Sequence, residues 1–260
     1  MNVSELVKKY KSLHLEDVID YTAFNKIAVS HHSTKIEGST LTPLEAQILL
    51  KDGLSPKNRP MQDVLMVIDH AAALDFVLNE AKNKSNLSVK FIQDINALVM
   101  KSTGKIYQTA FGEIDSAKGL FRKGAVFAGS SYFPSFDKVE RMTGDLIEEI
   151  NNAIKQPLSV QEQLNLSFDA HFKLVSIHPF YDGNGRTSRL LMNYLQAFYD
   201  LPPAIVDSSD RQAYFEALIA ARRKDDLTVF RKFMEDEYIR YLTDEIEKFE
   251  QANGQEPERS

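Results

Sequence analysis

Twelve consecutive residues, numbers 178–189, constrain the fold of this chain more than any other stretch. They read His-Pro-Phe-Tyr-Asp-Gly-Asn-Gly-Arg-Thr-Ser-Arg and lie between two runs whose apolar residues recur at helical spacing. The pattern predicts a tight loop between two core helices, the second beginning near Asn184 or Gly185. Gly183 and Gly185 can take positive φ and let a ligand approach the backbone. A helix N-terminus at this point would offer unpaired N–H groups to an anion.

The side chains of this stretch favour a polyphosphate ligand. Arg186 and Arg189 are three residues apart, which places both on one side of the first helical turn. Two guanidinium groups, oriented N–H groups and the Asp182 carboxylate together suit a polyphosphate with Mg²⁺. His178 then has the position of a general base. An ordinary interhelical turn has no need of these residue types together.

The same stretch resembles the signature of the Fic (filamentation induced by cAMP) family, His-x-Phe-x-Asp/Glu-Gly-Asn-Gly-Arg-x-x-Arg. All eight fixed positions of the signature are met. The resemblance implies an all-α, Fic-like helical domain with a β-hairpin flap. It also implies transfer of AMP from ATP to a Ser, Thr or Tyr hydroxyl of a target protein. The resemblance spans roughly residues 33–233 and is sharp at the signature, at the flap and near Glu37.

The family resemblance implies a role for each residue of the signature. His178 would deprotonate the incoming hydroxyl, and Asp182 would hold Mg²⁺ against the phosphates. Asn184 would donate to a phosphate, Arg186 would clamp one, and Arg189 would reach the far phosphate. Two downstream aromatic residues would wall the adenine. The expected nucleotide-binding set is Asp182, Gly183, Asn184, Gly185, Arg186, Thr187, Ser188, Arg189, Tyr214 and Phe215.

Two positions bear on which reaction and which nucleotide are expected. Kinase-type Doc relatives have lysine where this chain has Gly185, so the glycine favours AMP transfer. Some relatives place an asparagine against the adenine where this chain has Arg222. That departure leaves the nucleotide preference beyond ATP open.

A second motif precedes the signature in the chain. Ser33-x-x-x-Glu37-Gly38 resembles the inhibitory motif Ser/Thr-x-x-x-Glu-Gly/Asn, carried by the N-terminal inhibitory helix of autoinhibited Fic proteins. A Glu37 carboxylate paired with Arg189 would occupy the cation meant for the γ-phosphate. A bidentate pair of this kind is strong and directional. We therefore expect an enzyme whose activity is held low by its own N-terminal helix.

Residues 105–134 lack the helical period found on either side of them. Segments 119–122 and 126–128 are short, β-prone and next to glycine, which favours a hairpin. Fic proteins carry a similar flap, which holds the target segment as an added strand. The resemblance implies that the target docks on Phe127, Ala128, Gly129 and Ser130.

The rest of the chain predicts helices with several recognisable ends. Capping boxes begin at Thr42 and Ser159, and Ser88 is a third expected cap. Ser4 is the expected cap of a first short helix. Further helices are expected over about 21–34, 209–224 and 227–251. We expect three regions, namely N-terminal helices with the inhibitory motif (1–58), the catalytic domain (59–240) and a C-terminal helix end with an acidic tail (241–260).

Composition limits the class of protein. The net charge of −6 argues against a nucleic-acid partner. No apolar run approaches the length of a membrane span, the first residues show no signal-peptide pattern, and the sequence has no cysteine. We expect a cytoplasmic enzyme with no membrane partner, using Mg²⁺ as cofactor and ATP as substrate.

The sequence leaves several alternatives open. Glu37 could orient a water, which would make the protein a hydrolase that removes AMP from a modified target. The pocket could instead sense a nucleotide in a regulatory protein with weak catalysis. A toxin–antitoxin kinase is disfavoured by Gly185, and a DNA-binding regulator by the acidic charge. A homodimer is a further alternative, because autoinhibited members of the family often dimerise. The target protein, its modified side chain and the release signal are not identified.

Overall fold

The computed structural model describes residues 2–15, 21–128 and 131–254. Within these ranges most residues are helical, and the short strands form two antiparallel pairs. The helices are α1 (Val3–Ser12), α2 (Tyr21–Ile36), α3 (Pro43–Asp52), α4 (Met61–Lys82), α5 (Val89–Val99), α6 (Val139–Ala153), α7 (Val160–Ile177), α8 (Asn184–Phe198), α9 (Arg211–Lys224) and α10 (Leu227–Gly254). The strands are β1 (Ile106–Thr109), β2 (Gly112–Asp115), β3 (Phe127–Ala128) and β4 (Ser131–Tyr132).

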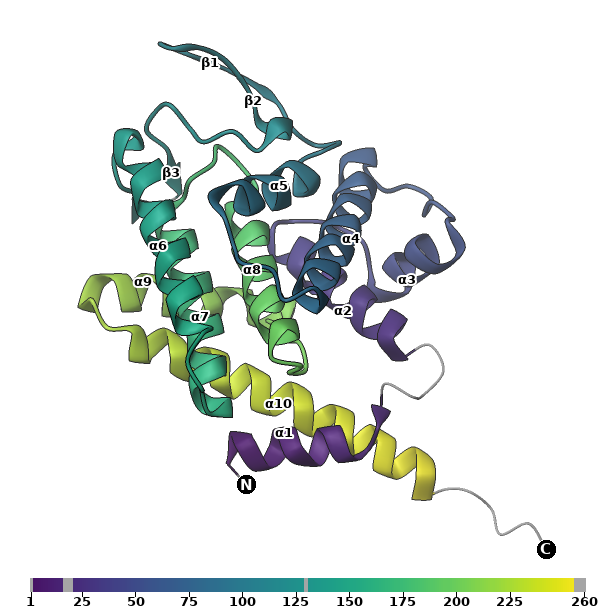
Figure 1. The fold of residues 1–260 in the computed structure, drawn as a ribbon. Helices are drawn as coiled ribbons and strands as arrows, with labels where there is room; N and C mark the ends of the chain where they lie inside the picture. Colours follow the sequence, from purple (N-terminus) through teal and green to yellow (C-terminus); the bar gives the residue numbers. More distant parts are fainter. Residues whose placement is uncertain (1, 16–20, 129–130, 255–260) are drawn as a thin grey trace, which may run out of the picture.

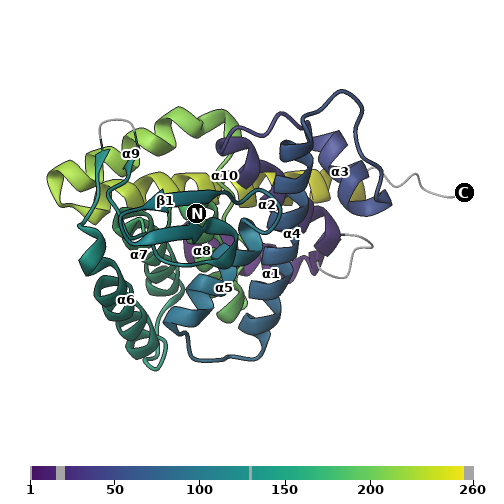
Figure 2. The same cartoon turned by 90° about the horizontal axis from the view of Figure 1, so that it is seen from above.

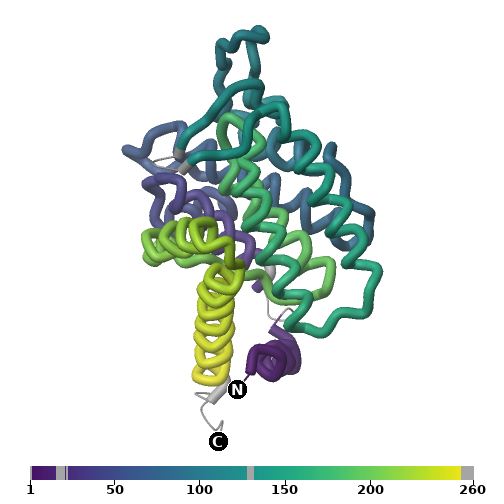
Figure 3. Tube along the Cα trace, turned by 90° about the vertical axis from the view of Figure 1, so that its left-hand side faces the viewer, coloured from purple at the N-terminus to yellow at the C-terminus, as the bar shows by residue number. Residues whose placement is uncertain are grey.

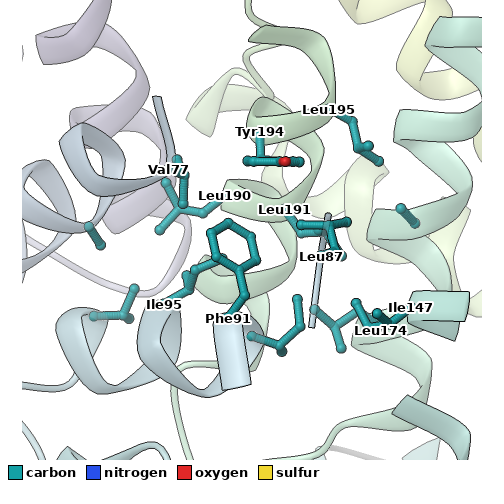
Figure 4. Packing of buried hydrophobic residues seen from close by; sticks show 14 of the residues in the cluster. Val77, Leu87, Phe91, Ile95, Ile147, Leu174, Leu190, Leu191, Tyr194 and Leu195 are labelled. Carbon is teal, nitrogen blue, oxygen red and sulfur yellow. The ribbon is translucent and has the colours of Figure 1, made fainter. Parts of the chain in front are cut away.

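Helix α8 is the centre of the fold and is surrounded by α4, α5 and α7 (Figure 1). Nearly every residue of α8 is buried, as expected for the apolar run that follows the signature. Figure 4 shows Leu190, Leu191 and Tyr194 of α8 packed against Phe91 and Ile95 of α5. The signature at residues 178–189 therefore leads into a helix that is held on several sides, which fixes the position of its N-terminal turn.

A second apolar cluster joins α1, α7, α9 and α10. In Figure 3 the hairpin end of the molecule is opposite the end where α1 lies beside the C-terminal part of α10. Helix α10 runs without a break from Leu227 to Gly254, so the expected region boundary at 240/241 falls inside one helix. None of the helices in the described ranges is both long enough and apolar enough to span a membrane.

Side-chain caps account for the starts of α1, α3, α5 and α7. The side chains of Thr42, Ser88 and Ser159 accept backbone N–H groups at the starts of α3, α5 and α7, as predicted. The expected cap of α1 is wrong, because Asn2 and not Ser4 has this role. Asn2 Oδ1 accepts the N–H of Glu5 while the Glu5 carboxylate accepts the N–H of Asn2, so a capping box begins two residues earlier.

The region between α5 and α6 holds two hairpins where the sequence predicted one. Strands β1 and β2 form the larger pair, seen over the helices in Figure 2. Residues 119–122 are not a strand, because Gly119 ends a short 3-10 turn with φ 62° and Arg122 is buried. In the smaller pair, Phe127 lies opposite Tyr132, and their side chains are 69% and 84% exposed. Of the expected target-docking residues, Gly129 and Ser130 lie outside the described ranges.

Candidate active site

The signature loop is built by its own side chains. Helix α7 ends at His178, which has φ 53° and ψ 60° in the left-handed region. Asn184 Oδ1 accepts the N–H of Phe180, and Asn184 Nδ2 donates to the Phe180 carbonyl, both at 2.9 Å. These two bonds hold the loop closed. Nδ2 has a second N–H, so the expected donation from Asn184 to a phosphate stays a prediction.

Arg122 ties this loop to the flap region. Its Nε donates to the His178 carbonyl at 2.8 Å, its Nη1 to the Gly124 carbonyl and its Nη2 to the Pro134 carbonyl. A buried guanidinium that donates to three carbonyls is a rigid connection. The arginine of the flap motif thus positions the backbone around His178, a function that the sequence alone did not indicate.

Glycine is required at two places in the loop. Gly183 has φ 78°, and a Cβ there would lie 2.8 Å from Asn96 Nδ2. A Cβ at Gly185 would lie 2.3 Å from Glu37 Oε1. A side chain at position 185 is therefore incompatible with the present place of Glu37. The close approach of Glu37 therefore explains, without reference to related proteins, why glycine occupies position 185.

The imidazole of His178 is covered by an aromatic ring from the flap side. Phe133 stacks on it with 3.9 Å between ring centroids and 21° between planes. Burial lowers the pKa of His178 to about 4, so the ring is neutral at pH 7. Nδ1 lies 3.4 Å from the Val175 carbonyl, and the tautomer that donates there leaves Nε2 as the basic nitrogen. The contact between Phe133 and His178 could not be predicted from local sequence, because the two residues are 45 positions apart.

Arg189 is 3% exposed. It is held by Ser33, in the last turn of α2, and by Glu37, the residue that follows α2. Its Nη2 donates to Glu37 Oε1 at 2.7 Å and to the Ser33 carbonyl at 3.0 Å, and its Nε donates to Ser33 Oγ at 2.9 Å. The pair with Glu37 is not the expected bidentate one, because Ser33 takes the Nε. Burial would raise the pKa of Glu37, but the charges of Arg189 and Arg186 hold that pKa below its ordinary value.

A third group on Arg189 comes from α9. Tyr214 OH accepts from Arg189 Nη1 at 3.3 Å and lies 2.9 Å from His171 Nε2. Burial raises the pKa of Tyr214, and burial lowers the pKa of His171 to about 3, so both are neutral at pH 7. His171 thus orients the tyrosine that contacts Arg189.

Arg186 and Asp182 form the other half of the site. Arg186 Nη2 lies 3.3 Å from Asp182 Oδ1, while Arg186 Nε and Nη1 are buried and lack a hydrogen-bond partner within the described ranges. Those atoms suit an anion that arrives with a ligand. The Asp182 side chain is 49% exposed. No group of three metal-binding side chains occurs among the residues described. Mg²⁺ nevertheless fits here, because it is commonly held by one carboxylate, phosphate oxygens and water.

Thr187 and Ser188 are not brought to the site surface. Thr187 Oγ1 accepts from Asn96 Nδ2, and Ser188 Oγ donates to the Gly185 carbonyl. Both residues are fully buried. Their side chains stabilise the first turn of α8 and its packing against α5, and their expected contact with a nucleotide stays a prediction.

A cavity of about 380 Å³ opens beside these groups, a size suited to a small ligand. Arg222 lies on its α9 wall, with the guanidinium carbon 5.6 Å from the centre of the Phe133 ring. Its Nε is buried without a hydrogen-bond partner in the described part of the chain. Tyr214 and Phe215 line the cavity, and their expected contact with an adenine stays a prediction. The other lining residues are Glu37, Phe133, Val175, His178, Gly185, Arg189, Leu218, Ile219 and Arg222.

Comparison with known proteins identifies the signature region. Residues 86–196 match the model of the Fic/DOC family. This segment is a Fic/DOC family domain. The protein adenylyltransferase Fic of Drosophila erecta is 28% identical over 207 residues, which cover 79% of this chain and 39% of that relative. The chain thus spans about two-fifths of the length of the curated relatives that it matches.

Solved structures share the fold of the Fic domain and of the helices around it. A Fic domain containing signaling protein from Bacteroides thetaiotaomicron has a TM-score of 0.82 and 25% identity, covering 99% of this chain and 100% of that one. Fic-1 from C. elegans has a TM-score of 0.75 and 22% identity, covering 95% and 72% of the two chains, and shows the likeness of fold alone. The expected all-α Fic-like fold with a β-hairpin is confirmed.

Proposed function

We propose that the protein is a protein adenylyltransferase, which transfers AMP from Mg-ATP to a Ser, Thr or Tyr hydroxyl of a target protein. The observation that carries the proposal is one cavity that is lined by a neutral His178, the Arg189 guanidinium and Gly185 in the first turn of α8. A base and phosphate-binding groups are the requirements of nucleotidyl transfer. The name of the matched relatives, protein adenylyltransferase, supports the same reaction.

In the proposed reaction His178 Nε2 takes the proton of the target hydroxyl. The hydroxyl oxygen then forms a bond to the α-phosphorus of ATP, and the bond from that phosphorus to the bridging oxygen of the β-phosphate breaks. Pyrophosphate leaves with the bond electrons. Arg186 and Arg189 offset the charge of the phosphates, and the N-terminus of α8 adds its partial positive charge.

Asp182 is the residue that would hold Mg²⁺. Its carboxylate is half-exposed in the loop before α8 and already contacts Arg186, which lies beside the expected phosphates. When bound, the ion would offset the negative charge of the phosphates during transfer. The oxygen ligands beyond Asp182 would come from the nucleotide and from water.

Glu37 would hold this activity low. Its carboxylate occupies Arg189, the cation that would otherwise receive the far phosphate of ATP. It also adds a negative charge to the place where the triphosphate must lie, so a productive arrangement of ATP requires Glu37 to leave. The target would dock on the flap, where Phe127 and Tyr132 present exposed aromatic rings on a two-residue antiparallel pair.

A hydrolase that removes AMP from a modified target is the second candidate. It is favoured by one observation, which is that Glu37 and His178 line the same cavity. A carboxylate there could orient a water toward the phosphorus of an AMP–protein bond. The two reactions use the same nucleotide site but depend in opposite ways on Glu37.

The decisive experiment incubates the purified chain with a protein extract and isotope-labelled ATP, UTP or CTP. Intact-mass measurement then identifies what is transferred. We expect AMP on protein, and more of it with Glu37→Gly than with the wild type. His178→Ala is expected to lower the rate about 10²–10⁴-fold while nucleotide affinity stays near that of the wild type. Transfer by His178→Ala at the wild-type rate would end the assignment. Loss of AMP from a labelled protein only when Glu37 is intact would favour the hydrolase.

A further inference from the structure

A second cavity in the described part of the chain is larger than the one beside His178. It has a volume of about 520 Å³ and lies where the end of α1, the start of α2, α4 and the end of α8 meet. It shares no lining residue with the cavity that contains His178, Glu37 and Arg189. Its size falls within the range of cavities that hold small organic ligands. It is lined by Tyr10, Lys11, His14, Tyr21, Asn25, Lys26, Val29, Leu74, Leu78, Asn193, Ala197, Asp200, Leu201, Pro202 and Pro203.

The inner walls of this cavity are apolar. Val29 of α2, Leu74 of α4 and Leu201 after α8 are core residues, so the cavity reaches the main apolar cluster. Leu78 and Ala197 add partly buried aliphatic surface, and Pro202 and Pro203 close one side. Apolar walls that face water are unfavourable unless something covers them. An apolar body is therefore the part of a ligand that these walls would take.

The polar groups of the interior already have partners. Tyr10 OH and Tyr21 OH lie 2.5 Å apart, and Tyr21 OH also donates to Glu245. Asn25 Oδ1 accepts from Tyr241 OH. A ligand that carried many polar groups would leave most of them unpaired inside the cavity, which costs free energy. The interior thus favours a ligand with few polar groups.

Among the described residues, the lysine and aspartate side chains that line the cavity carry a positive charge in sum. Lys26 is paired with Asp75, and Asp200 lies 3.6 Å from Lys84. Lys11 has no carboxylate partner among the described residues. The described part of the lining thus carries two ammonium groups and one carboxylate, and within it the Lys11 ammonium is the charge without a counter-charge. A single negative group on the ligand would pair with the Lys11 ammonium.

We propose that this cavity is a binding site for a small amphipathic anion, with an aliphatic or aromatic body and one carboxylate. The body packs against Val29, Leu74 and Ala197, and the carboxylate reaches the Lys11 ammonium. The site lies away from the catalytic cavity, one helical turn beyond Arg189 on α8 at Asn193 and one turn before Ser33 on α2 at Val29. Binding requires neither nucleotide nor AMP transfer, so the inference is independent of the proposed function.

Isothermal titration of the full chain with decanoate tests the proposal. We expect one molecule to bind per chain, and decanol to bind more weakly because it lacks the charge. Ala197→Phe, which fills the space from α8, is expected to abolish the binding. Its matched control is Ala110→Phe, in the exposed turn of the β1–β2 hairpin, with circular dichroism to show that both variants fold.

A second variant keeps the test decisive if Ala197→Phe does not fold. Lys11→Gln is expected to weaken decanoate binding about two- to fivefold, the effect of one exposed ion pair. Lys8→Gln removes an equal charge from α1 outside the cavity and is expected to leave the affinity unchanged. The proposal is overturned by an absence of binding heat for wild type. Equal affinity in Ala197→Phe and wild type, or equal weakening in Lys8→Gln and Lys11→Gln, would overturn it as well.

Discussion

Glu37 Oε1 lies 2.7 Å from Arg189 Nη2, and the same guanidinium is held by Ser33 on one side and Tyr214 on another. Every nitrogen of Arg189 therefore has a protein acceptor. Arg186 is the opposite case, because its Nε and Nη1 are buried and have no acceptor within the described ranges. The two arginines of the signature thus differ in their availability to a phosphate, because Ser33, Glu37 and Tyr214 occupy Arg189 alone.

Removing the Glu37 carboxylate should activate the protein. Glu37→Gly frees Nη2 of Arg189 and removes a negative charge from the phosphate site, and both changes favour a productive triphosphate. A shift from mostly blocked to mostly open corresponds to about 5 kcal/mol, on the order of one strong charge-assisted pair leaving a buried site. The measurement is AMP incorporation by intact mass.

Two further variants control this prediction. Glu37→Gln keeps the backbone and removes only the charge, so it should activate as well. Arg189→Ala breaks the same pair but also removes the phosphate clamp, so it should not activate. Activation by Glu37→Gly alone would instead point to a backbone effect at the end of α2. Equal losses in Glu37→Gly and Arg189→Ala would indicate a merely structural salt bridge.

Local sequence patterns predicted the start of a helix correctly where neighbouring residues determine it. The start of α8 at Asn184 and the caps at Thr42, Ser88 and Ser159 are all decided within one helical turn. The pairing of Glu37 with Arg189 was predicted from two motifs. The predicted bidentate geometry was wrong, because Ser33 accepts from Arg189 Nε. What remained hidden depends on contacts between distant segments, such as Phe133 on His178, His171 on Tyr214 and the three-carbonyl clamp of Arg122. Side-chain identity alone does not determine such contacts before the chain is folded.

Phe133 is expected to set the protonation of His178. Phe133→Ala uncovers the imidazole and lets water solvate its charged form, so the pKa of His178 should rise from about 4 toward the ordinary 6.5. NMR titration of the imidazole protons measures the change. The matched control is Phe136→Ala, in the same segment, whose ring packs on Phe111 and not on His178. A His178 pKa that stays near 4 in Phe133→Ala would show that other atoms exclude the water.

Asp182 is expected to account for the Mg²⁺ dependence of nucleotide binding. Asp182→Asn keeps the shape of the side chain but removes the charge that a hard cation requires. ATP affinity measured over a Mg²⁺ titration should then lose most of its dependence on the ion. Asp75→Asn, an exposed aspartate in α4 paired with Lys26, controls for the loss of one negative charge. An unchanged Mg²⁺ dependence in Asp182→Asn would remove Asp182 from the metal site.

The buried histidines should make the fold sensitive to acid. His70 is fully buried, its Nδ1 lies 3.2 Å from Ser30 Oγ, and burial lowers its pKa to about 3. The unfolded chain, with a pKa of about 6.5, binds more protons than the folded one between these values. The free energy of unfolding therefore falls as the pH drops below about 6.5. Each such histidine contributes up to about 1.4 kcal/mol per pH unit. Glu37 affects stability in a lower pH range. Because its pKa is lowered in the folded protein, the stability that it contributes is lost only as the pH falls below 4.5.

Urea unfolding between about pH 7 and about pH 5 isolates the histidine contribution. His70→Asn removes one titrating group, so its free energy of unfolding should change less steeply with pH than that of the wild type. The slope should not vanish, because burial also lowers the pKa of His171 to about 3. Val77→Ala is the control, since it opens a cavity in the same core without changing any titrating group and should lower the curve at every pH without changing its slope. Parallel curves for His70→Asn and the wild type would mean that His70 keeps an ordinary pKa in the folded protein.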